Sequence, residues 1–375
     1  LNRIYRLVWN RTLGVLQVVS ETATGRGAGA AGSRGGVVAP VAGAGPRLRV
    51  LAAYIAAALA GPVAAPAWAL PAGGTVVSGS IVVTSTPPPS ATLQIFQASS
   101  AAHINWSGFD VAAGESVLVN QSSASSGALF NVGGGAPSSM ISGTLASNGM
   151  VVLANPSGTI FNAGASVNVG GFLGTSLAPT AMITNSEGIR SMELALPTAL
   201  GVRAAVFNEG TISAASQGTV ALVGTNAINY GVVTADQGHI SLVAADAVTA
   251  DLESGNIVVT GALQGGLNPI PVSNAGTLSA SGGTIVLEGR AAPAYSSATL
   301  VSNTGVLLAR GGSVRMTAIG GGLVADGTID VAGASSGGPG GNVSIQTDRQ
   351  ASGGANINAG GGSVSIDGAP TGLSG

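Results

Sequence analysis

A short phrase that recurs along the second half of the chain constrains the fold more than any other feature. In each copy, a glycine is followed two and four residues later by a large apolar residue. A period of two places these apolar side chains on one face of a β-strand and the residue between them on the other face. The copies begin at Gly218, Gly238, Gly283, Gly312, Gly341 and Gly362, and the intervening residues expected to point outward are Ala221, Ser241, Val286, Arg315, Ser344 and Ser365.

A second phrase, Asn-x-Gly, precedes four of these predicted strands by nine or ten residues, starting at Asn208, Asn229, Asn274 and Asn303. Asn and Gly tolerate positive φ, so the phrase predicts turns. Successive glycines of the first phrase are 20, 45, 29, 29 and 21 residues apart. Spacings of 20 to 29, with 45 as a double step, are typical of solenoid coils. We expect an all-β protein, a right-handed parallel β-helix, with about 12–15 coils between residues 70 and 375.

The composition of the chain agrees with this fold. Of 375 residues, 61 are glycine, while aromatic residues account for 3% and charged residues for 7%. Large aromatic and charged side chains are difficult to stack in the ladders of a β-helix, and tight corners favour glycine. The chain has no cysteine. This excludes disulfides, thiolate metal sites and a thiol nucleophile.

The charge divides the chain near residue 70. Residues 1–69 contain seven arginines and one acid, a net +6, whereas the rest contains six arginines and 14 acids, a net −8. Arg47 and Arg49 precede an apolar run at 50–60, and Ala67-Trp68-Ala69 fits a cleavage pattern. We expect an extension at 1–46, a signal peptide at 47–69 and cleavage between Ala69 and Leu70. A membrane anchor is the alternative, but eleven apolar residues span only about 16 Å as a helix.

The first residues contain a specific motif, Tyr5-Arg6-Leu-Val-Trp9-Asn10, followed by Val19-Ser20-Glu21. The segment resembles the extended signal peptide region of large proteins exported by type V secretion in Gram-negative bacteria. In that family the extension is thought to slow targeting to the inner membrane. Leu1 predicts either an alternative start codon or a fragment, and the glycine-rich end without an obvious cap predicts that the protein continues beyond Gly375.

Residues 70–190 depart from the simple repeat and contain an ordered set of motifs. These are Ile104-Asn-Trp106-Ser-Gly-Phe109, Val117-Leu-Val-Asn120-Gln121, Ser142-Gly143-Thr-Leu-Ala-Ser-Asn148-Gly149 and Asn155-Pro156-Ser157-Gly158-Thr159. In order and spacing the segment resembles the secretion domain of the filamentous haemagglutinin family, the exported proteins of two-partner secretion (TPS). Residues 191–375 would then form the β-helix repeat region. The family motif Asn-Pro-Asn-Gly-Ile is altered at Ser157 and Thr159, and its second motif, Asn-Pro-Asn-Leu, is absent from the sequence.

The resemblance implies how the protein reaches its destination. Asn155, Pro156 and Gly158 correspond to the secretion motif, and Trp106, Phe109, Asn120, Gln121, Gly143, Asn148 and Gly149 to the framework around it. Periplasmic POTRA modules of a dedicated outer-membrane transporter would recognise this domain while it is unfolded. The protein would then fold at the cell surface and act as an adhesin or haemagglutinin, with a host-cell or bacterial surface receptor as its ligand. No cofactor, nucleic acid or enzymatic activity is implied.

Few residues of the sequence are candidates for a metal site or a catalytic site. The two histidines, His103 and His239, are too few for a zinc site without cysteine. The GxSxG match at 333–337 lies in a Gly/Ser run rather than at a strand-to-helix turn. Asp246, Asp251 and Glu253 fit either a solvated corner or a Ca²⁺ site. The alternative to an adhesin is a secreted β-helical polysaccharide-active enzyme, which needs clustered carboxylates beside basic residues.

Overall fold

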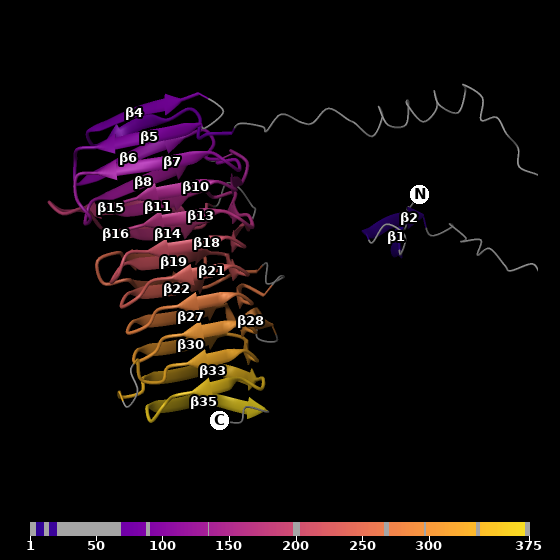
Figure 1. Ribbon diagram of the computed structural model, residues 1–375. Coiled ribbons are helices and arrows are strands. Elements are labelled where there is room, and N and C mark those ends of the chain that lie inside the picture. The colour runs from indigo at the N-terminus through magenta and orange to yellow at the C-terminus, as the bar shows by residue number, and fades with distance from the viewer. Residues whose placement is uncertain are drawn as a thin grey trace, which may run out of the picture. The chain divides into compact units, whose positions relative to one another are not determined.

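The computed structural model describes residues 5–10, 15–20 and 69–371, the last range with gaps at 88–90, 134, 198–202, 266–269, 296–297 and 335–337. Contacts divide the chain into two units, Leu1–Val63 and Ala64–Gly375. In the first unit, β1 (Tyr5–Asn10) pairs antiparallel with β2 (Val15–Ser20). The second unit is a stack of β-coils (Figure 1). Apart from Ala69, the predicted signal peptide lies outside the described residues.

The coils of the second unit contribute strands to three parallel faces, although the first coil has no strand on the second face and β33 extends from the first face into the second. The first face contains β6 (Ala101–Trp106), β8 (Gly127–Val132), β11 (Met150–Ala154), β14 (Gly171–Thr175), β19 (Thr219–Gly224), β22 (His239–Ala244), β27 (Thr284–Arg290), β30 (Ser313–Ile319), β33 (Asn342–Ser352) and β35 (Ser363–Thr371). The second face contains β9 (Ser139–Ile141), β12 (Thr159–Phe161), β17 (Ala205–Asn208), β20 (Asn226–Asn229), β25 (Val272–Asn274), β28 (Thr299–Asn303) and β31 (Gly322–Ala325), which pairs with the end of β33.

The third face completes the coils. It contains β5 (Thr92–Gln97), β7 (Ser116–Gln121), β10 (Thr144–Ser147), β13 (Ser166–Val169), β18 (Thr211–Ala214), β21 (Val232–Thr234), β26 (Thr277–Ser279), β29 (Val306–Leu308), β32 (Thr328–Asp330) and β34 (Asn356–Asn358). A 3₁₀ turn, η1 (Pro293–Tyr295), connects β27 to β28. Apolar side chains from all three faces fill one continuous core, which extends from Leu93 to Ala355. The parallel β-helix predicted from the sequence is confirmed.

The recurring glycine phrase marks β19, β22, β27, β30, β33 and β35, all on the first face. This face has ten parallel strands among the described residues, from β6 to β35, so it spans roughly 43 Å at about 4.8 Å per step. The prediction of 12–15 coils is therefore wrong. It assumed that every residue after Leu70 belongs to a coil, whereas an N-terminal cap and two hairpins lie outside the coils.

Antiparallel strands cap the N-terminal end of the stack. β3 (Thr75–Ser78) pairs antiparallel with β6, and β4 (Ile81–Thr86) pairs antiparallel with β5. Val76 lies opposite Ile104 and Val83 lies opposite Ile95, so both valines extend the inward ladders by one level. They are 44% and 42% exposed, because they form the outermost layer of the core.

Two hairpins leave the coils and form a four-stranded extrahelical sheet. The first hairpin is β15 (Ala178–Thr184) with β16 (Ile189–Ala195), and the second is β23 (Ala247–Asp251) with β24 (Asn256–Gly261). β16 and β23 pair antiparallel, which joins the two hairpins. The 45-residue step is therefore one coil that carries a hairpin, because β22 pairs directly with β27. Its interpretation as a double step is wrong.

The extrahelical sheet covers the outer side of the first face from β8 to β22 and creates a second apolar core. Leu129, Val152, Leu173 and Val223 from the coils contact Met192, Leu194, Val248 and Ala250 from the hairpins. This explains a partial error in the outward assignments. Ala221 and Ser241 point away from the coil interior but are 0% and 2% exposed, because the sheet and its turns lie over them.

The Asn-x-Gly phrases form buried ladders rather than turns with positive φ. Asn208 donates its side-chain amide to Asn229 at 2.7 Å, Asn229 to Asn274 at 2.8 Å and Asn274 to Asn303 at 2.7 Å. None of the four Asn-x-Gly phrases contains a residue with positive φ. The glycines are needed because the coils touch there: a Cβ on Gly231 would lie 2.1 Å from a carbonyl oxygen of the preceding coil.

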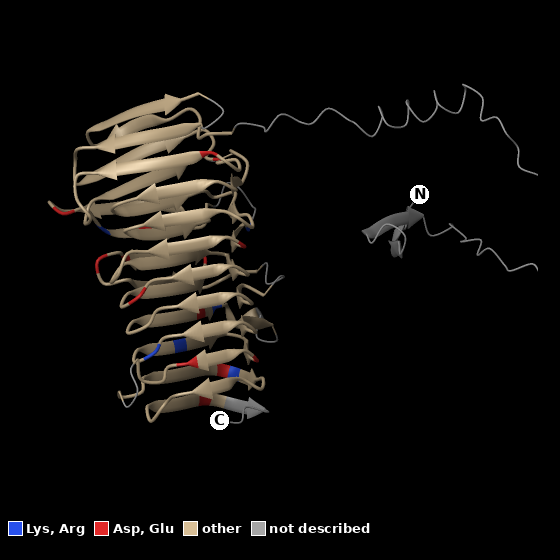
Figure 2. Ribbon diagram, viewed as in Figure 1, with Lys and Arg blue, Asp and Glu red and all other residues tan. Residues whose placement is uncertain are grey.

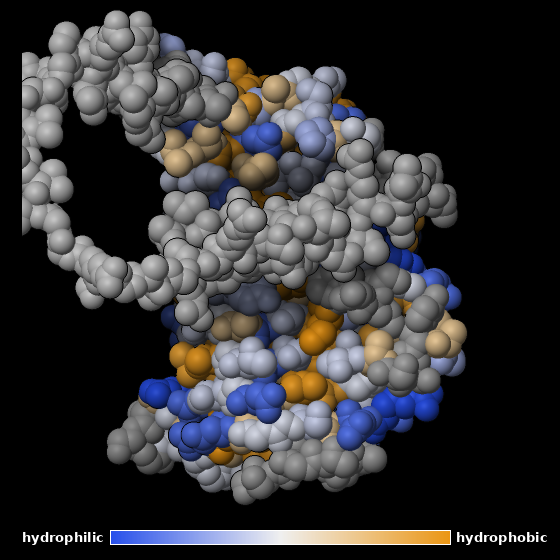
Figure 3. Space-filling view, turned by 90° about the vertical axis from the view of Figure 1, so that its right-hand side faces the viewer, coloured by the Kyte–Doolittle hydropathy of each residue, from blue (hydrophilic) through white to orange (hydrophobic). Residues whose placement is uncertain are grey.

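Charged side chains are sparse on the coils and lie mainly at turns and in the C-terminal half (Figure 2). On the face shown in Figure 3, apolar and hydrophilic residues are interspersed wherever the surface is not hidden by grey atoms. In the part of the chain that the structure describes, no helix is long and apolar enough to cross a membrane.

Candidate functional site

The predicted secretion motif is a tight, closed turn between β11 and β12. Asn155 accepts a hydrogen bond from the Ser157 amide at 2.9 Å and donates to the Pro137 carbonyl and the Ser139 hydroxyl, both at 3.0 Å. Gly158 has a φ of +96°, as expected for a glycine in such a turn. Asn155, Pro156 and Gly158 are all buried, so the folded domain presents little of this motif to a partner.

The framework aromatics lie together under the N-terminal cap. Trp106 meets Phe109 edge-to-face with ring centroids 5.6 Å apart, and Phe109 stacks on Phe130 at 5.3 Å. All three are nearly fully buried, and the indole Nε1 of Trp106 has no hydrogen-bond partner. Sequence reasoning singled out Trp106 and Phe109 but not Phe130, whose only signal is its place in the apolar run Ala128-Leu129-Phe130.

Three of the remaining framework residues, Gln121, Asn148 and Gly149, lie at the corner between the third and first faces. The Asn148 side chain takes the place of a strand neighbour for the backbone of Gln121. It accepts a hydrogen bond from the Gln121 amide at 2.8 Å and donates one to the Gln121 carbonyl at 3.0 Å. Gly149 packs against the Gln121 side chain, and Gly143 packs against carbonyl oxygens of the preceding coil. Asn120 is exposed and lines a shallow groove of about 480 Å³ together with Asn148 and Asn168. The structure thus brings Gln121, Asn148 and Gly149 together, whereas Gly143 and the aromatics lie elsewhere.

The predicted cleavage site lies beside a buried carboxylate that sequence reasoning missed. Glu115 is 1% exposed, and it accepts hydrogen bonds from the Ala69 amide at 2.8 Å and the Ala112 amide at 2.7 Å. The residues on either side of the predicted scissile bond, Ala69 and Leu70, are partly exposed. The residue on the N-terminal side of the predicted scissile bond is thereby attached to Glu115, which directly precedes β7.

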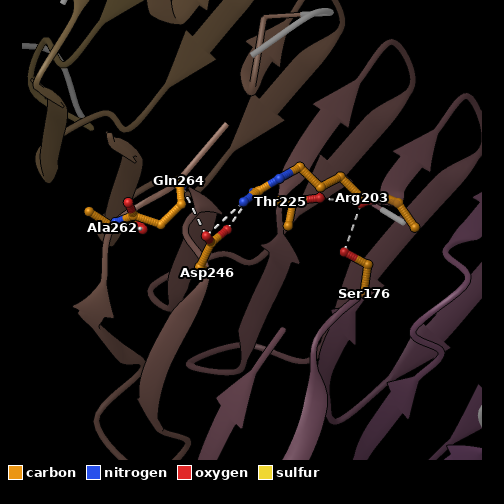
Figure 4. Close-up of polar contacts among 7 residues, drawn as sticks. Ser176, Arg203, Thr225, Asp246, Ala262 and Gln264 are labelled. Atoms are coloured by element: carbon orange, nitrogen blue, oxygen red, sulfur yellow. Dashed lines mark hydrogen bonds and ion pairs between the residues drawn. The ribbon is translucent and has the colours of Figure 1, made fainter. Parts of the chain in front are cut away.

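The candidate calcium ligands are engaged with other groups. Arg203 forms a bidentate ion pair with Asp246, with Nη2 and Oδ2 2.8 Å apart, and Asp246 also accepts from the Gln264 amide at 2.9 Å (Figure 4). Glu253 pairs with Arg190 at 3.3 Å. Among the residues that the structure describes, no group of three or more His, Cys, Asp or Glu side chains is arranged to hold a metal ion.

Asp251 closes the β23–β24 turn. Burial raises the pKa of this carboxyl, but hydrogen bonds from Ser254 and Glu253 and the charge of Arg190 outweigh burial and lower the pKa overall. Its Oδ1 accepts from the Glu253 amide at 3.0 Å and from the Ser254 amide at 3.1 Å. The Asp251 carboxylate thus holds the turn through two backbone amides.

The histidines lie in different settings. Burial lowers the pKa of His103 below its ordinary value of 6.5, and a hydrogen bond to Asn105, with Nε2 and Oδ1 3.0 Å apart, offsets part of the shift. His239 points outward from β22, but the β23–β24 turn lies against it, so it is only partly exposed. The serine of the GxSxG match lies outside the described residues.

The capped β-helix, together with the two-part leader, defines an exported β-helical exoprotein. A family model described as "TPS secretion domain" matches residues 67–372, and one described as "Extended Signal Peptide of Type V secretion system" matches residues 2–50. The chain belongs to the family of TPS secretion domains. It is a secreted, cell-surface exoprotein of a Gram-negative bacterium, and a TPS secretion domain implies a dedicated outer-membrane transporter.

Individual relatives agree with this assignment. The crystal structure of the HMW1 secretion domain from Haemophilus influenzae superposes with a TM-score of 0.59 at 22% identity, covering 80% of this chain and 74% of that one. The filamentous hemagglutinin secretion domain gives 0.53 at 17% identity, with 79% and 99% covered. These two likenesses show the shared fold.

Among curated proteins, a heme/hemopexin-binding protein of H. influenzae strain Rd is 34% identical over 142 residues, which is 38% of this chain and 15% of that protein. A second H. influenzae protein of the same description is 33% identical over 130 residues, or 35% and 14% of the two chains. The matched region spans about one-seventh of the length of these curated relatives.

Proposed function

We propose that periplasmic POTRA modules of the transporter bind residues 70–190 before this segment folds. Residues 191–375 then extend the β-helix outside the cell. The burial of Asn155, Pro156 and Gly158 supports this proposal. A partner can reach these side chains only in an unfolded chain. In the folded domain the same residues close a turn, so one motif serves two stages of export.

The test compares two buried asparagines. Asn155→Ala and Asn208→Ala each remove a fully buried amide with side-chain hydrogen bonds, but only Asn155 lies in the proposed recognition region. We expect Asn155→Ala to reduce transporter-dependent release into the medium severalfold more than Asn208→Ala does. Refolding of both purified variants measures their stability separately. Equal release of the two variants at equal stability would show that the motif acts only in folding.

The processing site is proposed on the Ala67-Trp68-Ala69 pattern. Cleavage after Ala69 would remove one neutral donor to Glu115 and create an α-ammonium group one residue away. N-terminal sequencing of the released protein should begin at Leu70. A different first residue, or an unprocessed chain in the medium, would contradict this proposal.

We propose that the exported protein is an adhesin that binds a host-cell or bacterial surface receptor, rather than an enzyme. The Asp246 side chain is only 15% exposed and is held by Arg203 and the Gln264 amide, which favours a structural role over use in polysaccharide cleavage. The heme/hemopexin-binding relatives favour a second candidate, binding of heme or hemopexin by the whole protein. Adhesion to epithelial cells and heme–hemopexin pull-down, each with and without the transporter gene, distinguish the two candidates.

A further inference from the structure

A cavity of about 310 Å³ lies on the outer side of the first face, where the extrahelical sheet ends. Its floor consists of side chains from β22, β27 and β30, which pair in register. One row across the coils is His239, Thr284 and Ser313, and the next row is Ser241, Val286 and Arg315. We name this cavity the Arg315 pocket.

The wall of the Arg315 pocket is the turn between β23 and β24. A glycine in this turn allows it to approach the floor closely. Gly255 has a φ of +69°, and a Cβ at this position would lie 2.7 Å from Cγ of His239. Ile257, two residues later, is 6% exposed and belongs to the second apolar core, so it anchors the wall. The pocket is therefore fixed by packing on both sides.

The charge of Arg315 is only weakly compensated. Its Nη2 lies 3.9 Å from Glu288, whose other oxygen is 2.6 Å from Nε of Arg290. Thus one buried carboxylate faces two guanidinium groups. Four of the six arginines after residue 69 lie within 3.3 Å of a carboxylate, and Arg315 does not.

The lining of the Arg315 pocket has the composition of an oxyanion site. No Asp or Glu lines it, although the chain after residue 69 carries a net charge of −8. The guanidinium fork offers several N–H donors to a carboxylate or a sulfate. Ser241, Thr284 and Ser313 add hydroxyls, and the Thr284 and Ser313 hydroxyls are 3.1 Å apart.

We propose that the Arg315 pocket binds the oxyanion, a carboxylate or a sulfate, of a small hydroxylated ligand. Arg315 and His239 contact the anion, while the hydroxyls of the floor exchange hydrogen bonds with the ligand's own hydroxyls. The pocket volume is at the lower end for small-molecule sites, which corresponds to a single sugar-sized group. This inference does not depend on the export proposal, because the pocket is a property of the folded coils.

The two histidines provide a direct test by NMR. The imidazole Cε1–H signals of His239 and His103 are followed in the purified protein during titration with sodium sulfate, glucuronate or glucose, with ionic strength held by NaCl. We expect a saturable shift of the His239 signal with sulfate or glucuronate, and none with glucose. The two anions distinguish a sulfate site from a carboxylate site. Equal shifts of both histidines, or saturation by glucose, would overturn the proposal.

Variants identify the contribution of Arg315. Arg315→Gln should weaken binding at least about tenfold, because it removes a charged donor. Arg315→Lys should retain part of the affinity. Arg349→Gln is the matched control, since it removes the same charge from an exposed position outside the pocket and should leave affinity within about twofold. Thermal unfolding confirms that each variant is folded. Unchanged affinity in Arg315→Gln would refute the assignment.

Discussion

Thr159 is a buried polar residue of β12, in register with Ser139 and Val206. It follows the Asn155 turn, where the related motif has isoleucine, and its side chain is 0% exposed with no partner for its hydroxyl. Burying an unpaired hydroxyl costs about 1–3 kcal/mol. Thr159→Val keeps the shape and removes the polar atom, so we expect the free energy of unfolding to rise by about 1–2 kcal/mol in urea denaturation.

Thr175 provides the matched comparison. It is equally buried, but its hydroxyl accepts a hydrogen bond from the Leu177 amide at 2.9 Å. Thr175→Val should therefore lower the free energy of unfolding by about 1–2 kcal/mol. If both substitutions changed stability in the same direction, hydrogen bonding would not be the reason for the difference.

We expect protonation of His103 to lower the stability of the folded protein in mild acid. Its pKa is lowered in the folded state by burial, so the unfolded chain binds a proton first as the pH falls. The contribution of neutral His103 to the free energy of unfolding is therefore complete above a pH of about 6.5. It is lost as the pH falls from there through the folded-state pKa. Melting temperatures between pH 8 and pH 5 should fall less in His103→Gln than in the wild type. Parallel curves for the two proteins would exclude His103 as the cause.

At the scale of elements, one ion pair fixes the base of both hairpins. Asp246 accepts from Arg203, which precedes β17, and from Gln264, which follows β24, and its carbonyl accepts from the Leu196 amide at 2.7 Å. The Arg203 and Asp246 side chains are only 20% and 15% exposed. Arg203→Met leaves this carboxylate without its partner and should loosen the extrahelical sheet while the coils remain intact.

Hydrogen exchange detected by mass spectrometry measures this loosening. We expect amides in β16 and β23–β24 to exchange roughly tenfold faster in Arg203→Met, with β7 and β10 unchanged. Arg310→Met is the control, because Arg310 pairs with Asp330 on the coils and is 56% exposed. An exchange increase spread evenly over all strands would show global destabilisation instead.

How far the sequence predicts the structure depends on whether a feature repeats. The glycine phrase located six strands of the first face correctly, because each copy faces the same core. The hairpins were missed, because each occurs once and the 45-residue spacing fitted two coils equally well. The Arg315 pocket was beyond prediction, since its wall depends on how the β23–β24 turn packs on His239. The roles of the secretion-motif residues stay predictions.

At the scale of the whole molecule, each coil pairs with the coil before it and the coil after it. Low charge and ladder packing let every added strand bury apolar surface against the strand already in place. A chain that emerges N-terminus first can therefore fold as it appears, beginning on the capped end formed by β3 and β4.

The extrahelical sheet interrupts this order. β16 must wait for β23, which lies more than fifty residues later in the sequence, before its second neighbour exists. In pulse-labelled refolding we expect β16 to gain protection together with β23–β24 and later than β8 and β11. Simultaneous protection of β14 and β16 would contradict this. A chain emerging through a pore would thus expose the apolar outer side of its first face for a defined interval, during which that side is open to chaperones, lipids or a neighbouring copy.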